Sequence, residues 1–158
     1  MTHDVKYRTI LVPLDGSPFG EQALPFAAGA ALRTGAVLEL VHVHRSDTVE
    51  TITPDPRWDE AFRRQQEEYL AAVAREVTRR HGVETRAEVV SGTPVYTLVQ
   101  RTEKPGVDLV VMTTHGRSGL SRVWLGSVAD GMVRGAKVPV LLIRPGEDDS
   151  PDRPAAEF

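Results

Sequence analysis

Two short apolar runs constrain the fold of this chain more than any other feature of its sequence. They are TILVP at Thr9–Pro13 and LVVMT at Leu109–Thr113. Neither run alternates with polar residues, and a strand that is apolar on both faces is typical of the centre of a parallel sheet. Two further mainly apolar runs predict strands at Val37–His44 and Val138–Arg144. Alternation of polar with apolar residues predicts one more strand, partly exposed, at Glu84–Val90.

Between the predicted strands, apolar residues recur at helical spacing. Four helices are expected: from Pro18 to a stop at Gly35, over residues 58–81, from Pro94 through Val99, and from Ser127 to Ala136. A proline inside a helix costs about 3 kcal/mol or kinks the helix, so we expect a bend at Pro25. Regular alternation of strands and helices implies right-handed crossovers. Residues 1–144 are therefore predicted to form a single doubly wound α/β domain, with a five-stranded parallel sheet and helices on both faces.

The composition excludes several classes of protein. The 158 residues fit one domain, and 19 Lys and Arg against 22 Asp and Glu give a net charge of −3, which offers no general attraction to nucleic acid or anionic lipid. The absence of cysteine excludes thiolate catalysis and fits a reducing compartment. The N-terminus lacks the apolar core of a signal peptide, and no run approaches the roughly 20 residues of a membrane helix. We therefore expect a cytoplasmic protein without nucleic-acid or membrane partners.

Residues 145–158 are expected to form a disordered tail after the domain. They contain three prolines and five acidic residues against one arginine. A segment of this composition buries too little apolar surface to offset the entropy lost on ordering.

A ligand site is expected at the carboxyl ends of Thr9–Pro13 and Leu109–Thr113. In a doubly wound sheet, ligands bind outside the carboxyl ends of the strands, where the strand order reverses. Asp15 follows the first of these two strands. Its carboxylate could accept hydrogen bonds from a nucleoside or bind a metal, or it could bond the backbone of its own turn, as Asp readily does.

A glycine-containing loop joins the second of these strands to the last predicted helix. It contains Gly116 and Gly119 and leads to Gly126 and Ser127. Glycines let backbone N–H groups approach an anion closely, a helix N-terminus adds donors and a favourable dipole, and Arg117 could supply charge. Alternatively, the glycines only shape a connection and Ser127 only caps the helix. The spacing matches neither a Walker A loop nor the G-x-G-x-x-G fingerprint.

The histidines and acids do not form a recognisable catalytic or metal centre. His42 and His44 alternate along one predicted strand and share a face, but no third ligand is evident, so both are interpreted as core or rim histidines. His115 lies in the candidate loop, where it could contact a ligand or simply be solvated. The sequence contains no nucleophile arrangement or paired-carboxylate spacing. No catalytic residue and no metal ligand is therefore predicted.

With these motifs the chain resembles the universal stress protein family over nearly all of residues 7–144. The likeness includes Ile10–Ser17, Ser91–Pro94, His115–Ser127 and Val138–Leu141. The resemblance implies an adenine nucleotide alpha hydrolase-like fold with strand order 3-2-1-4-5. It also implies ATP or AMP as the ligand, with or without Mg²⁺.

The resemblance further implies which residues contact the nucleotide. Pro13 and Asp15 would contact the nucleoside, and Val43 the adenine. The ribose and phosphates would lie against the glycines and the serine of the last motif. The full set of expected nucleotide-binding residues is Pro13, Asp15, Val43, Met112, Thr113, Gly116, Arg117, Gly119, Gly126, Ser127 and Val128.

One position departs from the family pattern. Members that bind ATP carry G-x2-G-x9-G-[S/T], and Thr113 stands where the first glycine belongs. Its Cβ is expected to weaken ATP binding. We expect a stress-response protein that binds an adenine nucleotide and is not an enzyme, with weak ATP hydrolysis at most. The alternatives are an interaction protein that binds no nucleotide and a slow ATPase.

A homodimer is expected through the Val138–Arg144 strand. This run is apolar and last in the chain, and an apolar sheet edge exposes unpaired N–H and C=O groups that invite pairing. Pairing with a second copy gives a two-fold dimer, the commonest oligomer, and the resemblance implies the same edge. Pro139 and the acidic tail could instead blunt this edge.

Overall fold

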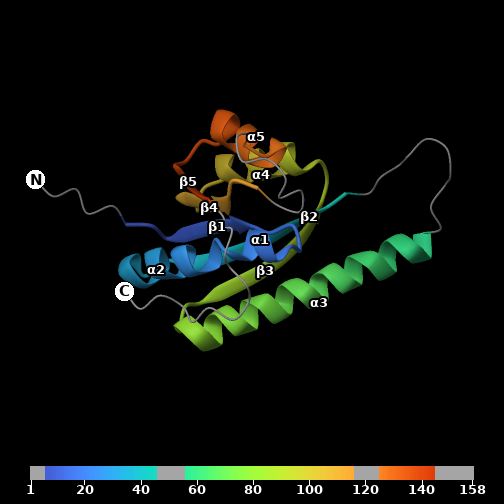
Figure 1. The fold of residues 1–158 in the computed structure, drawn as a ribbon, viewed down its shortest axis with the longest axis horizontal. Coiled ribbons are helices and arrows are strands. Elements are labelled where there is room, and N and C mark those ends of the chain that lie inside the picture. The colour runs from blue at the N-terminus through green and yellow to red at the C-terminus, as the bar shows by residue number, and fades with distance from the viewer. Residues whose placement is uncertain (1–5, 46–55, 116–124, 145–158) are drawn as a thin grey trace, which may run out of the picture.

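Five parallel strands form one sheet in the order β3-β2-β1-β4-β5 (Figure 1). The strands are β1 (Thr9–Pro13), β2 (Val37–His44), β3 (Thr85–Ser91), β4 (Leu109–Thr113) and β5 (Val140–Ile143). The structure is a computed structural model that describes residues 6–45, 56–115 and 125–144. The predicted doubly wound α/β fold and its strand order are confirmed. The predicted tail at 145–158 lies outside the described residues.

Helices cover both faces of the sheet, as predicted (Figure 1). They are α1 (Pro18–Glu21), α2 (Leu24–Thr34), α3 (Pro56–His81), α4 (Pro94–Glu103) and α5 (Ser127–Gly135). On one face, α2 and α3 bury strand residues such as Leu38 and Leu40. On the other face, α4 and α5 pack over Leu11, Val41 and Val110. Alternate side chains of a strand point to opposite faces, so the central strands contribute to both cores.

The prediction of one bent helix from Pro18 to Gly35 is wrong, because this segment forms two helices. α1 ends at Glu21 and α2 begins at Leu24, which places Pro25 in the first turn of α2. Proline is tolerated there because first-turn N–H groups have no partner within the helix. Deeper in a helix, its ring and its missing N–H would disrupt the preceding turn. The predicted stop is confirmed, since Gly35 ends α2 with a φ of 71°.

The last strand is shorter than predicted. β5 covers Val140–Ile143 rather than Val138–Arg144. Pro139 has no N–H to donate to the sheet, although its carbonyl accepts a hydrogen bond from Val110 N at 2.9 Å. Strand geometry therefore begins after the proline. β3 begins and ends one residue later than predicted.

Two glycines allow α5 to pack closely on α4. A Cβ at Gly131 would lie 2.5 and 2.7 Å from the two methyl carbons of Val95. A Cβ at Gly135 would lie 2.8 Å from a methyl carbon of Val99. These distances are shorter than carbon atoms tolerate, so the small size of glycine sets the separation of the two helices.

Gly131→Ala should lower the free energy of unfolding by about 1–3 kcal/mol, because the β-branched Val95 has little freedom to move away. Urea unfolding followed by circular dichroism measures the change. The matched control is Gly29→Ala in α2, where the nearest atom to an added Cβ is an Arg33 side-chain nitrogen at 3.5 Å. This control should raise stability by about 0.5–1 kcal/mol, as alanine does in an open helix interior. Equal effects at the two glycines would contradict the packing argument.

Candidate ligand-binding site

The candidate site lies at the carboxyl ends of β1 and β4. Ile10 of β1 pairs with Leu109 of β4, and Leu11 pairs with Val110, so the two strands run in parallel side by side. The chain passes from β1 to β2 on one side, whereas β4 lies on the other side. The strand order therefore reverses between β1 and β4, which is where doubly wound proteins bind ligands.

β2 holds the turn that follows β1. Leu14 N donates to Val41 O at 2.9 Å, and Leu14 O accepts a hydrogen bond from His42 Nδ1 at 2.8 Å. Because a carbonyl only accepts, Nδ1 of this histidine carries a hydrogen. His42 is 7% exposed, so its interpretation as a core histidine is confirmed. These two bonds fix the peptide that precedes Asp15.

Asp15 uses one carboxylate oxygen to organise the turn. Its Oδ1 accepts hydrogen bonds from Ser17 N at 2.9 Å and from Ser17 Oγ at 2.6 Å. Ser17 Oγ accepts in turn from Gly20 N at 3.1 Å and caps α1. A Cβ at Gly20 would lie 2.8 Å from this carboxylate oxygen, so a larger residue would displace it. The structural alternative for Asp15, that it bonds the backbone of its own turn, is therefore confirmed.

Thr113 also bonds the turn that follows its strand. It is 7% exposed, and its Oγ1 donates to His115 O at 2.8 Å. Along β4, Val111 belongs to the core under α2 and α3, and Met112 belongs to the core under α4 and α5. Thr113 therefore points to the α2 and α3 side. Glycine has no side-chain donor and could not make this hydrogen bond.

Four of the predicted contacts share the opposite face, under α4 and α5. Met112 is buried in the core there, and the partly buried Val43 and Val128 pack against that core. Leu11 belongs to the same core, and Pro13 lies two residues later on β1, so Pro13 points the same way. The structure thus places an apolar lining on this face near the carboxyl edge.

The N-cap residue of α5 differs from the predicted one. Gly126, and not Ser127, is the N-cap residue, with φ −60° and ψ 153°. Gly126 N donates to Thr114 O at 2.8 Å, and a Cβ on Gly126 would lie 3.0 Å from that same oxygen, so close contact with the end of β4 favours glycine. Ser127 is the first helical residue and is exposed. A glycine has no side chain to cap the first N–H groups of α5, which form the positive end of the helix dipole.

Two carboxylates elsewhere in the fold have shifted pKa values. A hydrogen bond from Arg79, and then one from Arg80, lowers the pKa of Glu76 on α3 to about 2. Burial alone would raise the pKa of Asp108, just before β4, but backbone hydrogen bonds at the start of β1 and the charge of Arg8 lower it.

Across the described ranges, no three His, Asp or Glu side chains lie close enough to hold a metal ion, and no helix is long and apolar enough to span a membrane.

His44 is buried as predicted, but its two partners on α3 are not among the predicted residues. His44 is 1% exposed, which confirms the interpretation. Its Nδ1 lies 2.7 Å from Gln66 Oε1, and its Nε2 lies 2.8 Å from Asp59 Oδ1. These two partners are two helical turns apart on α3, so they share a face. That spacing is the signal from which the partners could have been identified.

Three predicted residues cannot be placed. Gly116, Arg117 and Gly119 lie outside the described residues. The described part of the candidate site therefore consists of the Asp15 turn, the apolar lining and the start of α5.

The sheet order and this edge define an α/β fold of the adenine nucleotide alpha hydrolase type. A model of the universal stress protein family matches residues 6–144. A universal stress protein of Methanocaldococcus jannaschii is 30% identical over 141 residues, which cover 87% of this chain and 82% of that protein. The chain belongs to the universal stress protein family. It spans about half, 47%, of a longer family member from Mycobacterium tuberculosis that is 34% identical over 142 residues.

Solved structures agree with this assignment. The universal stress protein UspA from Lactobacillus plantarum has a TM-score of 0.78 at 26% identity, covering 89% of this chain and 100% of that chain. Family structures with cAMP, with AMP (from Arabidopsis thaliana) and with dAMP (from Archaeoglobus fulgidus) have TM-scores of 0.66, 0.62 and 0.61. They cover 90%, 94% and 88% of this chain and 100%, 98% and 99% of their own. At 22%, 22% and 20% identity they establish the shared fold.

Thr113→Val should destabilise the protein, because valine keeps the branched shape but removes the hydroxyl that donates to His115 O. A typical net contribution of such a neutral hydrogen bond is about 0.5–1.5 kcal/mol of unfolding free energy. Thr113→Ser retains the hydroxyl and is the matched control, which should lose less. Thermal unfolding by calorimetry compares the three proteins. A valine variant as stable as the parent would show that this hydrogen bond does not hold the turn.

Proposed function

We propose that this protein binds an adenine nucleotide at the carboxyl edge of β1 and β4 and acts in a stress response. The observation that carries the proposal is the start of α5, where the N-cap residue Gly126 bonds the end of β4 and has no side chain of its own to cap the helix. First-turn N–H groups without helical partners, together with the helix dipole, favour a phosphate group. The family structures with cAMP, AMP and dAMP bound support an adenine nucleotide as the ligand class.

The proposed contacts divide the nucleotide into an apolar and an anionic part. Pro13, Val43 and Met112 lie on one face and would contact the base, whose faces are apolar. Asp15 would contact the nucleoside. The phosphates would lie on the start of α5, against Gly126, Ser127 and Val128, with Gly116, Arg117 and Gly119 completing the set. The ligand would be ATP or AMP, with or without Mg²⁺.

The orientation of the Thr113 side chain favours nucleotide binding over the alternative, a protein that binds no nucleotide. Its side chain points to the α2 and α3 side, whereas the apolar lining lies on the α4 and α5 side. The Cβ that replaces the family's first glycine therefore does not enter this lining. We propose binding without turnover, because Asp15, the carboxylate that follows β1, already accepts two hydrogen bonds from Ser17.

Ser127→Asp should weaken the binding of AMP and ATP at least tenfold and leave the fold intact. The added carboxylate repels phosphate, but an acid in the first turn interacts favourably with the helix dipole. Titration calorimetry measures affinity, and thermal unfolding reports the fold. This substitution is preferred to any at Gly126, where a Cβ would press on Thr114 O and disturb folding together with binding.

Ser127→Asn is the matched control, because it has the shape of aspartate without the charge. It should bind within a few-fold of the parent. Equal affinities of the Asp and Asn variants would place the phosphates away from α5. If neither the parent nor the Asn variant binds AMP or ATP, the protein is better explained as an interaction protein.

We further propose a cytoplasmic homodimer that pairs through β5. β5 is the last strand of the described sheet, with β4 on one side. Its Leu141 is 42% exposed, whereas Val140 and Leu142 pack against the core under α4 and α5. An edge of this kind can pair with a second copy, which would bury Leu141.

Leu141→Lys should convert the dimer to a monomer, because it would place two charges against each other across the two-fold axis. Size-exclusion chromatography with light scattering measures the mass. The control is Trp58→Lys, a change at an apolar side chain that is 75% exposed in the first turn of α3. Figure 1 shows that this end of α3 lies far from β5. A parent that is already monomeric, or a Leu141→Lys variant that stays dimeric, would contradict the proposed edge.

A further inference from the structure

The N-terminal half of α3 is not anchored by an apolar core. Residues 57–65 are all exposed, and burial begins at Leu70. Figure 1 shows this end of α3 extending past the end of β2. A helical segment of this length is marginal in water by itself. The contacts that dock it on the sheet therefore decide whether it stays ordered.

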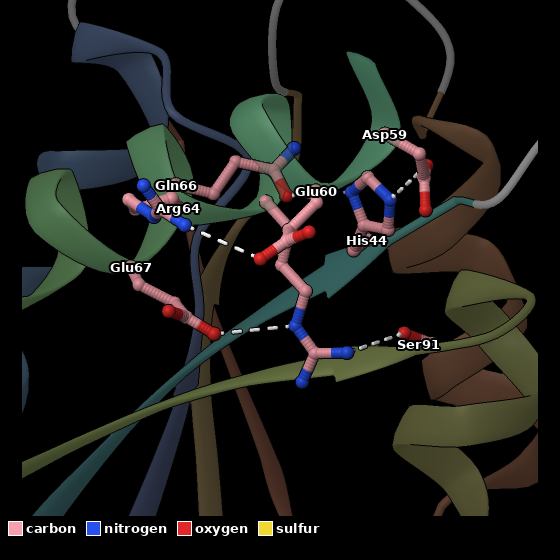
Figure 2. A network of polar contacts seen from close by, with 8 residues as sticks. His44, Asp59, Glu60, Arg64, Gln66, Glu67 and Ser91 are labelled. Atoms are coloured by element: carbon pink, nitrogen blue, oxygen red, sulfur yellow. Dashed lines mark hydrogen bonds and ion pairs between the residues drawn. The ribbon is translucent and has the colours of Figure 1, made fainter. Parts of the chain in front are cut away.

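His44, the last residue of β2, connects the sheet to this half of α3 (Figure 2). Its buried ring lies between Asp59 and Gln66, with Nε2 2.8 Å from the carboxylate Oδ1 and Nδ1 2.7 Å from the amide Oε1. The Phe62 ring packs beside it, with ring centroids 5.7 Å apart. Three residues on one face of α3 thus surround a buried imidazole.

Both ring nitrogens of His44 face oxygen atoms that only accept hydrogen bonds. An ionised Asp59 carboxylate has no hydrogen to donate, and neither has an amide oxygen. With the Gln66 amide oriented as in Figure 2, both ring nitrogens carry a hydrogen, and the ring is a cation. Loss of one proton would leave Nδ1 and the amide oxygen as two facing acceptors until the amide turned round.

The other charged side chains in this network are bonded among themselves. The pairs are Arg63 with Glu67 at 3.2 Å and Arg64 with Glu60 at 3.2 Å. From β3, the neutral Ser91 Oγ accepts from Arg63 at 3.4 Å. From β2, His42 shares the face of His44 and donates to Leu14 O. Asp59, whose side chain is 48% exposed, is therefore the counter-charge of the His44 ring.

We propose that His44 is a proton-dependent clamp that docks the N-terminal half of α3 on β2. The clamp is complete when His44 is protonated and Asp59 is ionised. As pH rises and His44 loses its proton, the ion pair is lost, the Gln66 amide must turn round to keep its hydrogen bond to Nδ1, and this half of α3 loosens. Because the docked state holds the proton, docking weakens as protons become scarce. Acidification that protonates Asp59 removes the ion pair as well.

Two measurements on the full chain test the clamp. Nitrogen-15 NMR at about pH 5.5 should show both ring nitrogens of His44 bonded to hydrogen. A ring with one bare nitrogen at that pH would overturn the proposal. Hydrogen exchange read by mass spectrometry should show that protection factors over residues 57–66 fall roughly tenfold or more between about pH 5.5 and about pH 8. Protection factors are already corrected for the intrinsic effect of pH on exchange.

Variants separate the clamp from other causes of pH dependence. His44→Gln should remove the pH dependence of protection over residues 57–66. Asp59→Asn changes a half-exposed side chain that the fold tolerates, and it should lower protection at about pH 5.5 toward the parent's value at about pH 8. His81→Gln, at the opposite end of α3, is the matched control and should keep the parent's pH dependence. A parent without pH dependence, or an Asp59→Asn variant with the parent's protection at both pH values, would overturn the proposal even if His44→Gln failed to fold.

Discussion

The hydrogen-bonding needs of two buried central strands determine most of this structure. The N–H and C=O groups of β1 and β4 cannot reach water, so each strand needs a neighbouring strand on both sides. β1 lies between β2 and β4, and β4 lies between β1 and β5. Right-handed crossovers to parallel neighbours place helices on both faces and make the strand order reverse at the centre. The turn at Asp15 and the start of α5 meet the sheet at this reversal because the two strands that lead to them are partners.

Features that depend on burial were predictable, and features that depend on one tertiary hydrogen bond were not. Apolar runs identified the central strands β1 and β4 because burial on two faces leaves no room for polar residues. Gly126 takes the cap position expected for Ser127 because its N–H reaches Thr114 O across a loop, and nothing in the local sequence separates these two candidates. Pro25 was interpreted within one helix, whereas the break that precedes it places the proline in a first turn, where it costs little.

The candidate site shows why a sequence can locate such an edge and still not specify its ligand. Asp15 and Thr113 are polar residues at strand ends, and both bond the backbone of their own turns. Residues of this kind are placed by the same chemistry whether or not a ligand binds. What remains at the described edge is an apolar lining and a helix start whose donors belong to the main chain. Main-chain donors carry no side-chain signature, so only the family resemblance pointed to a nucleotide.

The end of β2 contributes both to the proposed nucleotide site and to the proposed His44 clamp. Val43 and His44 are consecutive and point to opposite faces, one toward the core under α4 and α5 and the other toward α3. Gly92 N also donates to His44 O at 3.0 Å, which ties this strand end to the start of the next connection. A backbone segment held from both faces cannot shift on one side without disturbing the other. If an adenine packs on Val43, it would restrain the same backbone that carries the His44 ring. Linkage is reciprocal, so a protonated clamp would then favour the bound base as much as the base favours the clamp.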